Sequence, residues 1–238
     1  MFDIAAATSV GLVRQVNEDR ASVNGQRLME GQLLEQRIHG PTLVMVADGM
    51  GGHARGEIAS EISLQELERR TDNLLDQHGI IPAIRGANRV VYDLAASNPA
   101  YRGMGSTLVG AQMDEEVCTW FNVGDSRAYL CRSKRLQQLS KDHVPPMAKG
   151  ATRSHAISQS LGGAPYFREV TPSIGSLDLT LGDRILLCSD GLTDVVSDDE
   201  IASIICFDGP AACVASLLDL VLSKGAPDNV TVIVLARS

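Results

Sequence analysis

The chain has 238 residues and a formal net charge of −8; 44% of its residues are hydrophobic and 21% are charged. Such a length and apolar content are typical of one globular domain, so we expect a single unit over residues 1–238 and exclude a disordered chain. The acidic balance argues against a nucleic-acid partner, because binding to a phosphate backbone requires a basic face.

We expect neither a membrane span nor a signal peptide in this sequence. No apolar run approaches the length of a membrane span, and the N-terminus has an acid where a signal peptide has a base. We therefore predict a cytoplasmic protein without membrane contact. The five cysteines are an odd number and form no C-x-x-C pair, so we interpret them as small core residues in a reducing compartment.

The first forty residues predict short strands joined by polar turns. We expect strands at 3–10 and 21–23 and a hairpin or loop at 24–41. Between the two strands, Glu18 and Asp19 lie in a mixed-charge segment. Taken alone, that segment is best interpreted as a solvated ion cluster on the surface.

The stretch 42–56, TLVMVADGMGGHARG, is the most informative part of the sequence. Residues 42–47 are apolar and β-branched, as in a buried strand, and we expect this strand to stop at Asp48. A carboxylate there needs a partner, and the glycines that follow allow a sharp turn close to a ligand. Three interpretations remain open here: a metal site, a plain tight turn, and a dinucleotide fingerprint of the form G-x-G-x-x-A. Against the fingerprint, Asp48 would repel a pyrophosphate.

The remaining elements follow from periodicity and punctuation. Two helices are predicted first, then three strands that we expect to form an antiparallel meander, then an irregular segment rich in proline and glycine. A buried strand, two more helices and a last β-branched strand complete the chain. In order, these elements are expected at 57–70, 82–96, 106–113, 117–123, 127–131, 141–163, 183–189, 198–206, 210–224 and 230–236.

Four aspartates share a position relative to the predicted strands. Asp48 and Asp190 each end a strand, Asp125 follows one, and Asp228 precedes the last one. Because antiparallel strands place the end of one beside the start of the next, we expect these carboxylates to gather at one sheet edge. Divalent cations relieve their mutual repulsion, and an all-oxygen set favours magnesium or manganese over zinc. Several acids sharing ions suggest a two-metal centre, which suits in-line displacement at phosphorus.

Six ordered motifs along the chain carry a resemblance to a known family. They resemble the metal-dependent serine/threonine protein phosphatases, the PPM or PP2C-like family, over almost the whole chain. Any one motif is weak, but the ordered set is highly specific. The motifs are Val13-Arg14…Asn17-Glu18-Asp19, Val46-Ala47-Asp48-Gly49-Met50-Gly51-Gly52-His53, Gly103-Met104-Gly105-Ser106-Thr107, Val123-Gly124-Asp125-Ser126-Arg127, Cys188-Ser189-Asp190-Gly191-Leu192 and Asp228-Asn229-Val230-Thr231.

The resemblance implies an α+β fold, a four-layer αββα sandwich in which helices flank two central antiparallel sheets. It also implies ligands for two Mn²⁺ or Mg²⁺ ions. Asp48 would bridge both ions, the Gly49 carbonyl would bind one of them, and Asp190 and Asp228 would bind the other. Asp125 would share a third ion with Asp190.

Other positions would serve the substrate and the water. Glu18 and Asp19 would hold metal-bound waters, and Arg14 would clamp the substrate phosphate with its rigid donor fork. The resemblance implies that a hydroxide bridging the two ions attacks phosphorus in line, without a covalent intermediate. His53 is a candidate proton donor to the leaving oxygen, although a turn-stabilising role or a metal-bound water are the alternatives.

The implied function is hydrolysis of phosphoserine and phosphothreonine in proteins by a monomeric bacterial-type enzyme that opposes a Ser/Thr kinase. The segment 144–160, which corresponds to the mobile flap of the family, is only 17 residues long, so we expect a shortened flap. Two alternatives are a regulatory phosphatase specific for one partner and a catalytically weak phosphoprotein-binding module. The metal acids Asp48, Asp190 and Asp228 are all present, which weakens the second alternative.

Overall fold

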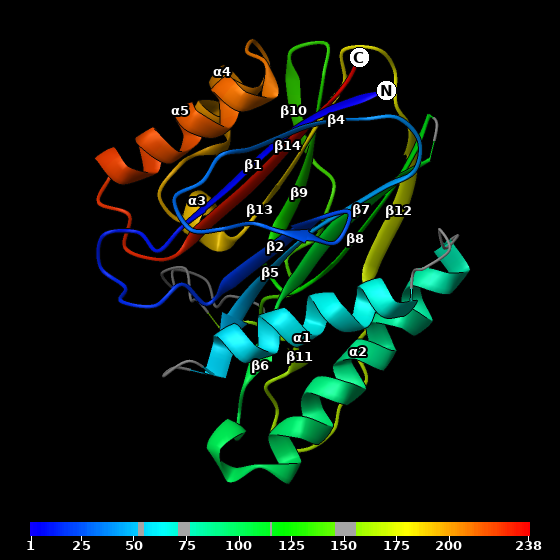
Figure 1. Cartoon of the computed structure of the whole chain (residues 1–238), viewed down its shortest axis with the longest axis vertical. Coiled ribbons are helices and arrows are strands. Elements are labelled where there is room, and N and C mark those ends of the chain that lie inside the picture. Colours follow the sequence, from blue (N-terminus) through cyan, green and yellow to red (C-terminus); the bar gives the residue numbers. More distant parts are fainter. Residues whose placement is uncertain (52–54, 71–76, 115, 146–155) are drawn as a thin grey trace.

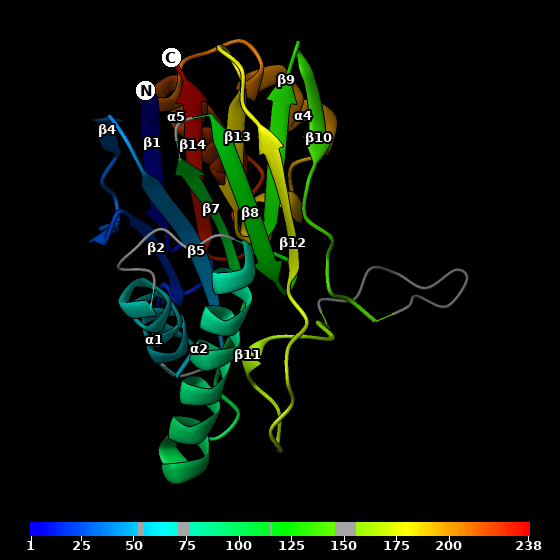
Figure 2. The same ribbon diagram turned by 90° about the vertical axis from the view of Figure 1, so that its right-hand side faces the viewer.

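Two antiparallel β-sheets stack face to face, and helices cover the outer face of each (Figures 1 and 2). The structure is a computed structural model that describes residues 1–51, 55–70, 77–114, 116–145 and 156–238. The predicted four-layer αββα sandwich is therefore confirmed.

The six-stranded sheet contains both ends of the chain. Its strands are β1 (Phe2–Ser9), β4 (Leu34–Ile38), β9 (Arg127–Arg132), β10 (Arg135–Gln138), β13 (Arg184–Cys188) and β14 (Val230–Arg237). They are ordered β10-β9-β13-β14-β1-β4, and every neighbouring pair is antiparallel. Its outer face is covered by α3 (Asp190–Thr193), α4 (Asp198–Ile205) and α5 (Pro210–Ser223).

The eight-stranded sheet is built around β5. Its strands are β2 (Asp19–Val23), β3 (Gln26–Arg27), β5 (Thr42–Met50), β6 (Gly105–Ser106), β7 (Leu108–Asp114), β8 (Val117–Val123), β11 (Leu161–Gly162) and β12 (Ser173–Asp178). The main path is β11-β6-β5-β7-β8-β12, and β2 pairs with β5 and β3. Helices α1 (Arg55–Arg70) and α2 (Gln77–Ser97) pack on its outer face, and a short 3-10 helix, η1 (Pro99–Tyr101), follows α2.

The central strands are apolar on both faces because each separates two cores. In β14, Ile233 and Leu235 contact the core between the sheets, whereas Val232 and Val234 pack against α3–α5. This double burial explains why the last strand has a continuous β-branched sequence rather than an alternating one. Ser197 and Glu200 form a capping box at the start of α4, which fixes where this helix begins.

The predicted meander is wrong at its third strand. β7 and β8 are neighbours, but β9 belongs to the other sheet, where it pairs with β10 and β13. The chain therefore crosses from one sheet to the other at Gly124–Asp125. A three-residue connection is compatible with either a hairpin or a crossover, and only the packing of the two sheets decides between them.

Several element boundaries also differ from the prediction. β5 continues through Asp48 to Met50, because β2 and β6 supply hydrogen-bonding partners beyond the apolar run. α2 begins at Gln77, so Pro82 lies inside the helix rather than at its start. The strands β4, β10 and β12 were missed since all three are sheet edges with exposed, polar positions. No helix in the described ranges is long and apolar enough to cross a membrane.

All five cysteines are buried, but the expectation that they are reduced is wrong for two of them. Cys131 on β9 and Cys206 at the end of α4 form a disulfide, although 75 positions separate them, while Cys118, Cys188 and Cys213 are free and buried. The packing of α4 on the six-stranded sheet brings the pair together, and sequence spacing carries no sign of it.

This disulfide predicts a redox-dependent stability. Reduction of the wild-type protein should lower the free energy of unfolding by about 2–4 kcal/mol, because the crosslink restricts the unfolded chain. Urea unfolding with and without dithiothreitol measures the difference. Cys206→Ser should be destabilised to a similar degree and insensitive to reductant; a wild-type protein equally insensitive to reductant contradicts the prediction.

Candidate functional site

Seven of the predicted site residues lie at one end of the sandwich and line a cavity of about 640 Å³: Arg14, Glu18, Asp48, Gly49, Asp125, Asp190 and Asp228. They come from both sheets and from the crossover between them, not from one sheet edge as expected. Asp48 is on β5, Asp190 begins α3 directly after β13, and Asp228 precedes β14. The cavity is lined by Arg14, Glu18, Asp48, Gly49, Met50, Gly51, Thr107, Asp125, Ile157, Asp190, Asp194, Val195, Pro227, Asp228 and Asn229.

Asp48 is held in the sheet by Thr107. The Asp48 N–H donates to the Thr107 hydroxyl at 3.0 Å, and the Thr107 N–H donates to the Asp48 carbonyl at 2.8 Å. The Thr107 hydroxyl in turn contacts the Ser126 hydroxyl at 2.7 Å, next to Asp125. The backbone that carries two of the predicted ligands is thus tied together by a threonine whose role the sequence did not reveal.

Gly49 is required by a close backbone approach between β5 and α1. A Cβ at Gly49 would collide with the carbonyl of Gly56, and a Cβ at Gly56 would lie 2.6 Å from the Gly49 carbonyl carbon. The two glycines let the start of α1 pack directly on the end of β5. The Gly49 N–H donates to the Glu18 carbonyl at 3.2 Å, which links this turn to the loop before β2.

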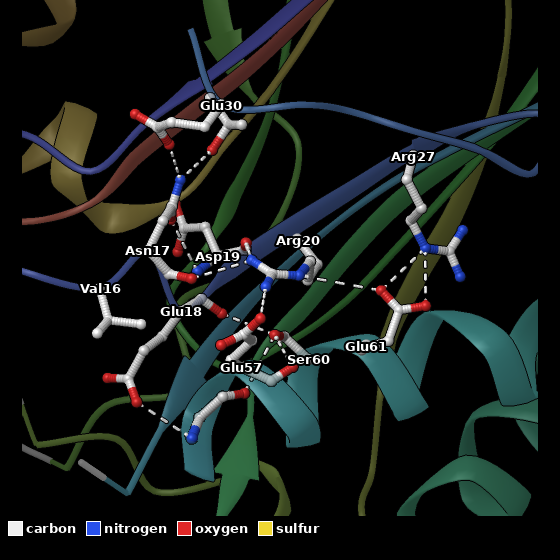
Figure 3. A network of polar contacts seen from close by, with 12 residues as sticks. Val16, Asn17, Glu18, Asp19, Arg20, Arg27, Glu30, Glu57, Ser60 and Glu61 are labelled. Carbon is white, nitrogen blue, oxygen red and sulfur yellow. Dashed lines mark hydrogen bonds and ion pairs between the residues drawn. The ribbon is translucent and has the colours of Figure 1, made fainter. Parts of the chain in front are cut away.

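Glu18 is positioned from three directions. Its backbone N–H donates to the Asn229 side chain at 2.9 Å, and its carbonyl accepts from the Ser60 hydroxyl at 2.7 Å. Its carboxylate accepts from the Gly56 N–H at 3.1 Å (Figure 3). Asn229 also donates to the carbonyls of Val10 and Val16, both at 3.0 Å. Asn229 therefore fixes the loop that carries Arg14 and Glu18 against the start of β14.

Asp19 is the most deeply buried of the predicted acids, with only 2% of the residue exposed. One of its carboxylate oxygens accepts from the hydroxyls of Ser189 and Thr231, each at 2.7 Å. It pairs across the sheet with Asp48, so two carboxylate-bearing residues face each other in register. Asp19 does not line the cavity itself, and it is held by Ser189, which follows β13, and by Thr231 on β14.

Asp125 is placed by His143. The Gly124 N–H donates to Nδ1 of His143 at 3.0 Å, and the His143 N–H donates back to the Gly124 carbonyl at 2.8 Å. Burial lowers the pKa of His143, so the neutral ring that accepts this bond is favoured. The neighbouring Arg127 is engaged by Asp142, at 2.7 Å between Nη2 and Oδ2. His143 was missed by the sequence analysis, which assigned it no function.

Arg14 lies at the cavity but faces a predicted metal ligand. Its Nη2 donates to Oδ2 of Asp228 at 2.6 Å, and this hydrogen bond raises the pKa of Arg14. Half of the Arg14 side chain is exposed, so the guanidinium is accessible from the cavity mouth. His53 and residues 146–155 of the predicted flap lie outside the described residues.

The electrostatics of the cavity are those of a cation site. Burial, followed by the charges of Asp19, Asp190, Asp125 and Asp228, raises the pKa of Asp48 well above its usual range. Burial and the neighbouring Asp125 raise the pKa of Asp190 to about 8, and burial raises that of Asp19 to about 6. Hard oxygen donors that crowd at such a cost fit Mn²⁺ or Mg²⁺. Among the described residues, no three His, Cys, Asp or Glu side chains form a ready-made metal cage, in keeping with mutual repulsion and the Arg14–Asp228 pair.

These raised pKa values predict how the metal-free protein responds to pH. The folded state holds protons on Asp190 and Asp19 more tightly than the unfolded state does, so their contribution to stability is lost as pH rises from about 4 towards 8. The melting temperature without metal should therefore fall between pH 5 and pH 8, by about 2–4 °C per kcal/mol lost. Calorimetry in a chelating buffer measures this.

Two comparisons sharpen that test. Asp190→Asn should flatten the decline, and added Mn²⁺ should raise the melting temperature most at the higher pH, since ligands must lose their protons to bind metal. A metal-free protein that becomes more stable from pH 5 to pH 8 contradicts the predicted crowding of carboxylates.

Comparison with known proteins agrees with this geometry. The chain matches the family model described as protein phosphatase 2C over residues 32–213. It is 33% identical to the serine/threonine protein phosphatase PstP of Mycobacterium tuberculosis over 97% of this chain and 44% of PstP, so it spans less than half of that relative. It is 30% identical to the protein phosphatase PhpP of Streptococcus pneumoniae over 97% of this chain and 96% of PhpP.

A solved structure extends the likeness to three dimensions. The crystal structure of the catalytic domain of PstP in complex with two manganese ions matches this fold with a TM-score of 0.80 at 32% identity, over 99% of both chains. The family expected from the ordered motifs is thereby confirmed. This chain belongs to the protein phosphatase 2C family.

Proposed function

We propose that this chain is a metal-dependent protein phosphatase that removes phosphate from phosphoserine and phosphothreonine. The observation that carries the proposal is the cavity at the end of the sandwich, where Asp48, Asp125, Asp190 and Asp228 meet with raised pKa values at Asp48 and Asp190. Ionised carboxylates crowded into one cavity repel one another, so this arrangement favours cation binding. The relative PstP, named a serine/threonine protein phosphatase, and the relative PhpP, named a protein phosphatase, support the reaction.

The proposed ligands follow the positions around the cavity. Asp48 and the Gly49 carbonyl would hold ions on the β5 side, and Asp190 and Asp228 would hold them on the β13–β14 side. Asp125 would add a ligand for a third ion beside Asp190. When bound, such ions neutralise the crowded carboxylates and acidify a water for in-line attack at phosphorus.

The remaining residues are not proposed as metal ligands; they orient carboxylates or the substrate phosphate. Ser189 and Thr231 hold the Asp19 carboxylate at 2.7 Å each, and the Gly56 N–H holds that of Glu18 at 3.1 Å. Both carboxylates are thereby oriented to hold water molecules at the metal site. Arg14 would exchange its contact with Asp228 for the substrate phosphate once cations neutralise Asp228, because a guanidinium binds phosphate with two parallel hydrogen bonds.

We further propose that the physiological substrates are phosphorylated proteins, including a Ser/Thr kinase of the same cell and its targets. The activity test is hydrolysis of p-nitrophenyl phosphate and of a phosphothreonine peptide, with and without Mn²⁺. Turnover that requires Mn²⁺ on both substrates supports an enzyme, and binding without turnover supports a phosphoprotein-binding module instead.

Replacing the central carboxylate gives the first prediction for this function. Asp48→Asn keeps the shape but removes the charge expected to lie between two ions, so kcat on p-nitrophenyl phosphate should fall roughly 100-fold or more. Asp219→Asn, a surface change on α5, serves as the matched control and should retain full activity. Near-normal turnover of Asp48→Asn at saturating Mn²⁺ would overturn the ligand assignment.

Replacing Arg14 tests the phosphate clamp. Arg14→Ala should lower kcat/KM about 10- to 100-fold, the worth of a charged hydrogen bond of roughly 1.5–3 kcal/mol, and Arg14→Lys should recover part of it. Because Arg14 forms a salt bridge with Asp228 in this structure, Arg14→Ala frees that carboxylate and should also tighten Mn²⁺ binding in calorimetric titrations. Unchanged kinetics with tighter Mn²⁺ binding would show that Arg14 serves only to neutralise Asp228.

A further inference from the structure

Several exposed apolar side chains lie in or close in sequence to the loop 14–19, which carries Arg14 and Glu18. Of the eleven large hydrophobic residues exposed in the described part of the chain, five lie between residues 12 and 33. Two of these five, Val16 and Met29, line the same groove, and exposed apolar side chains that share a groove are common at sites of protein interaction. The five are Leu12, Val13, Val16, Met29 and Leu33, with 43–67% of each exposed.

Part of this group lines a groove of about 500 Å³. We call it the apolar groove, because Val10, Val16, Leu28 and Met29 form its apolar wall. The loop 14–19 separates the groove from the catalytic cavity. Arg14 and Glu18 line the cavity, whereas the intervening Gln15, Val16 and Asn17 line the groove. A ligand in the groove is thus one loop away from the proposed metal centre.

The rim of the groove is acidic despite two arginines. Glu30, Glu57 and Glu61 line it, against Arg20 and Arg27, while Asp19 lies buried behind it. Both guanidiniums are already engaged by α1 (Figure 3): Arg20 pairs with Glu57, and Arg27 pairs with Glu61 at 3.0 Å and with Glu68 at 2.6 Å. The rim therefore retains an excess of negative charge.

Glu30 is the acidic residue of the rim that accepts its hydrogen bonds from neutral groups. Its carboxylate accepts hydrogen bonds from the Val10 N–H at 2.8 Å and from the Asn17 side chain at 2.7 Å, which are both neutral donors. The charge of Glu30 is thus oriented but not neutralised by these contacts, and it lies beside the exposed side chain of Met29. An apolar surface with an acidic rim is complementary to a segment that combines lysine or arginine with a large apolar side chain.

The wall of the groove is held in place by hydrogen bonds to two strands. Asn17 donates to Thr8 at 2.8 Å, Thr8 contacts Thr231 at 2.8 Å, and Thr231 donates to Asp19 at 2.7 Å. This chain of hydrogen bonds anchors the groove wall to β1 and β14. A preformed wall lowers the entropic cost of binding a flexible peptide.

We propose that the apolar groove docks a basic segment of the phosphoprotein substrate, with one large apolar side chain seated against Val16 and Met29. The phosphorylated residue of the same substrate occupies the catalytic cavity on the other side of the loop 14–19. This inference rests on the proposed function, to which it adds a substrate preference that the catalytic residues alone do not supply. The net charge of −8 also favours approach of a basic segment.

The test is kinetic and uses the full chain with Mn²⁺. Phosphothreonine peptides of about 20 residues carry a Leu-Arg-Arg block at about 4, 8 or 12 positions on either side of the phosphothreonine, since an extended chain advances about 3.3–3.6 Å per residue. Matched peptides carry Leu-Glu-Glu or Ser-Arg-Arg. The best-placed Leu-Arg-Arg peptide should show kcat/KM about 10-fold above both matches, mainly through KM, and the advantage should shrink as salt is raised.

Met29→Lys removes the apolar contact and repels a basic segment. It should abolish the preference while leaving hydrolysis of p-nitrophenyl phosphate unchanged, because that ester is too small to reach the groove. Leu181→Lys is the control, because Leu181, before β13, is also exposed (75%, against 61% for Met29), and it should keep the preference. Loss of the preference in Met29→Lys alone supports the docking site.

Two results overturn the inference. One is equal kcat/KM for all blocks in the wild-type protein, and the other is a preference that survives Met29→Lys.

Failure of the proposed function is a separate outcome, because it shows as no Mn²⁺-dependent turnover of p-nitrophenyl phosphate. In that case fluorescence anisotropy of the same peptides decides the docking alone: tighter binding of Leu-Arg-Arg that Met29→Lys removes supports it, and indifference to the block rejects it.

Discussion

The structure depends on the crowding of carboxylates at one end of two stacked sheets. Asp48 and Asp19 face each other across β5 and β2, and Asp190, Asp125 and Asp228 approach the same cavity from the other sheet and the crossover. Such an arrangement opposes folding, because each buried charge loses its hydration and repels the others. The fold supports it by anchoring the surrounding backbone with hydroxyl and amide groups. A divalent cation bound among these carboxylates would relieve this repulsion, in keeping with the metal-dependent function proposed above.

The residues around the acidic side chains are mostly neutral hydrogen-bonding groups, which fix the carboxylates or their backbone without cancelling the negative charge. Ser189 and Thr231 hold Asp19, and the Gly56 N–H holds Glu18. Asn229 ties the catalytic loop to β14, and His143 holds the turn before Asp125. Arg14 is the exception, since its guanidinium neutralises Asp228 in this structure. A cation that binds Asp228 would release that arginine for an anionic substrate, which couples metal binding to phosphate recognition.

The two sides of the loop 14–19 have different chemistry. Towards the cavity the loop presents Arg14 and Glu18, and towards the groove it presents Val16 and Asn17. The first side suits a reaction at phosphorus that is common to the protein phosphatase 2C family, and the second suits recognition of a particular partner. Separating the two allows one catalytic centre to serve different substrates through changes in surface residues that take no part in the reaction.

The sequence by itself determined the family and the layered fold, because the ordered motifs are local patterns, and its strand-end aspartates predicted the acids of the candidate site. It also located the buried strands and the helices α4 and α5, whose periodicity and capping are written in consecutive residues. Only the tertiary structure decided that β9 crosses to the second sheet, that β5 extends past Asp48, and that Cys131 meets Cys206. These features depend on contacts between segments far apart in the chain. The supporting roles of Thr107, Asn229 and His143 were hidden for the same reason, since a polar residue in a turn reveals its partner only when the turn is packed.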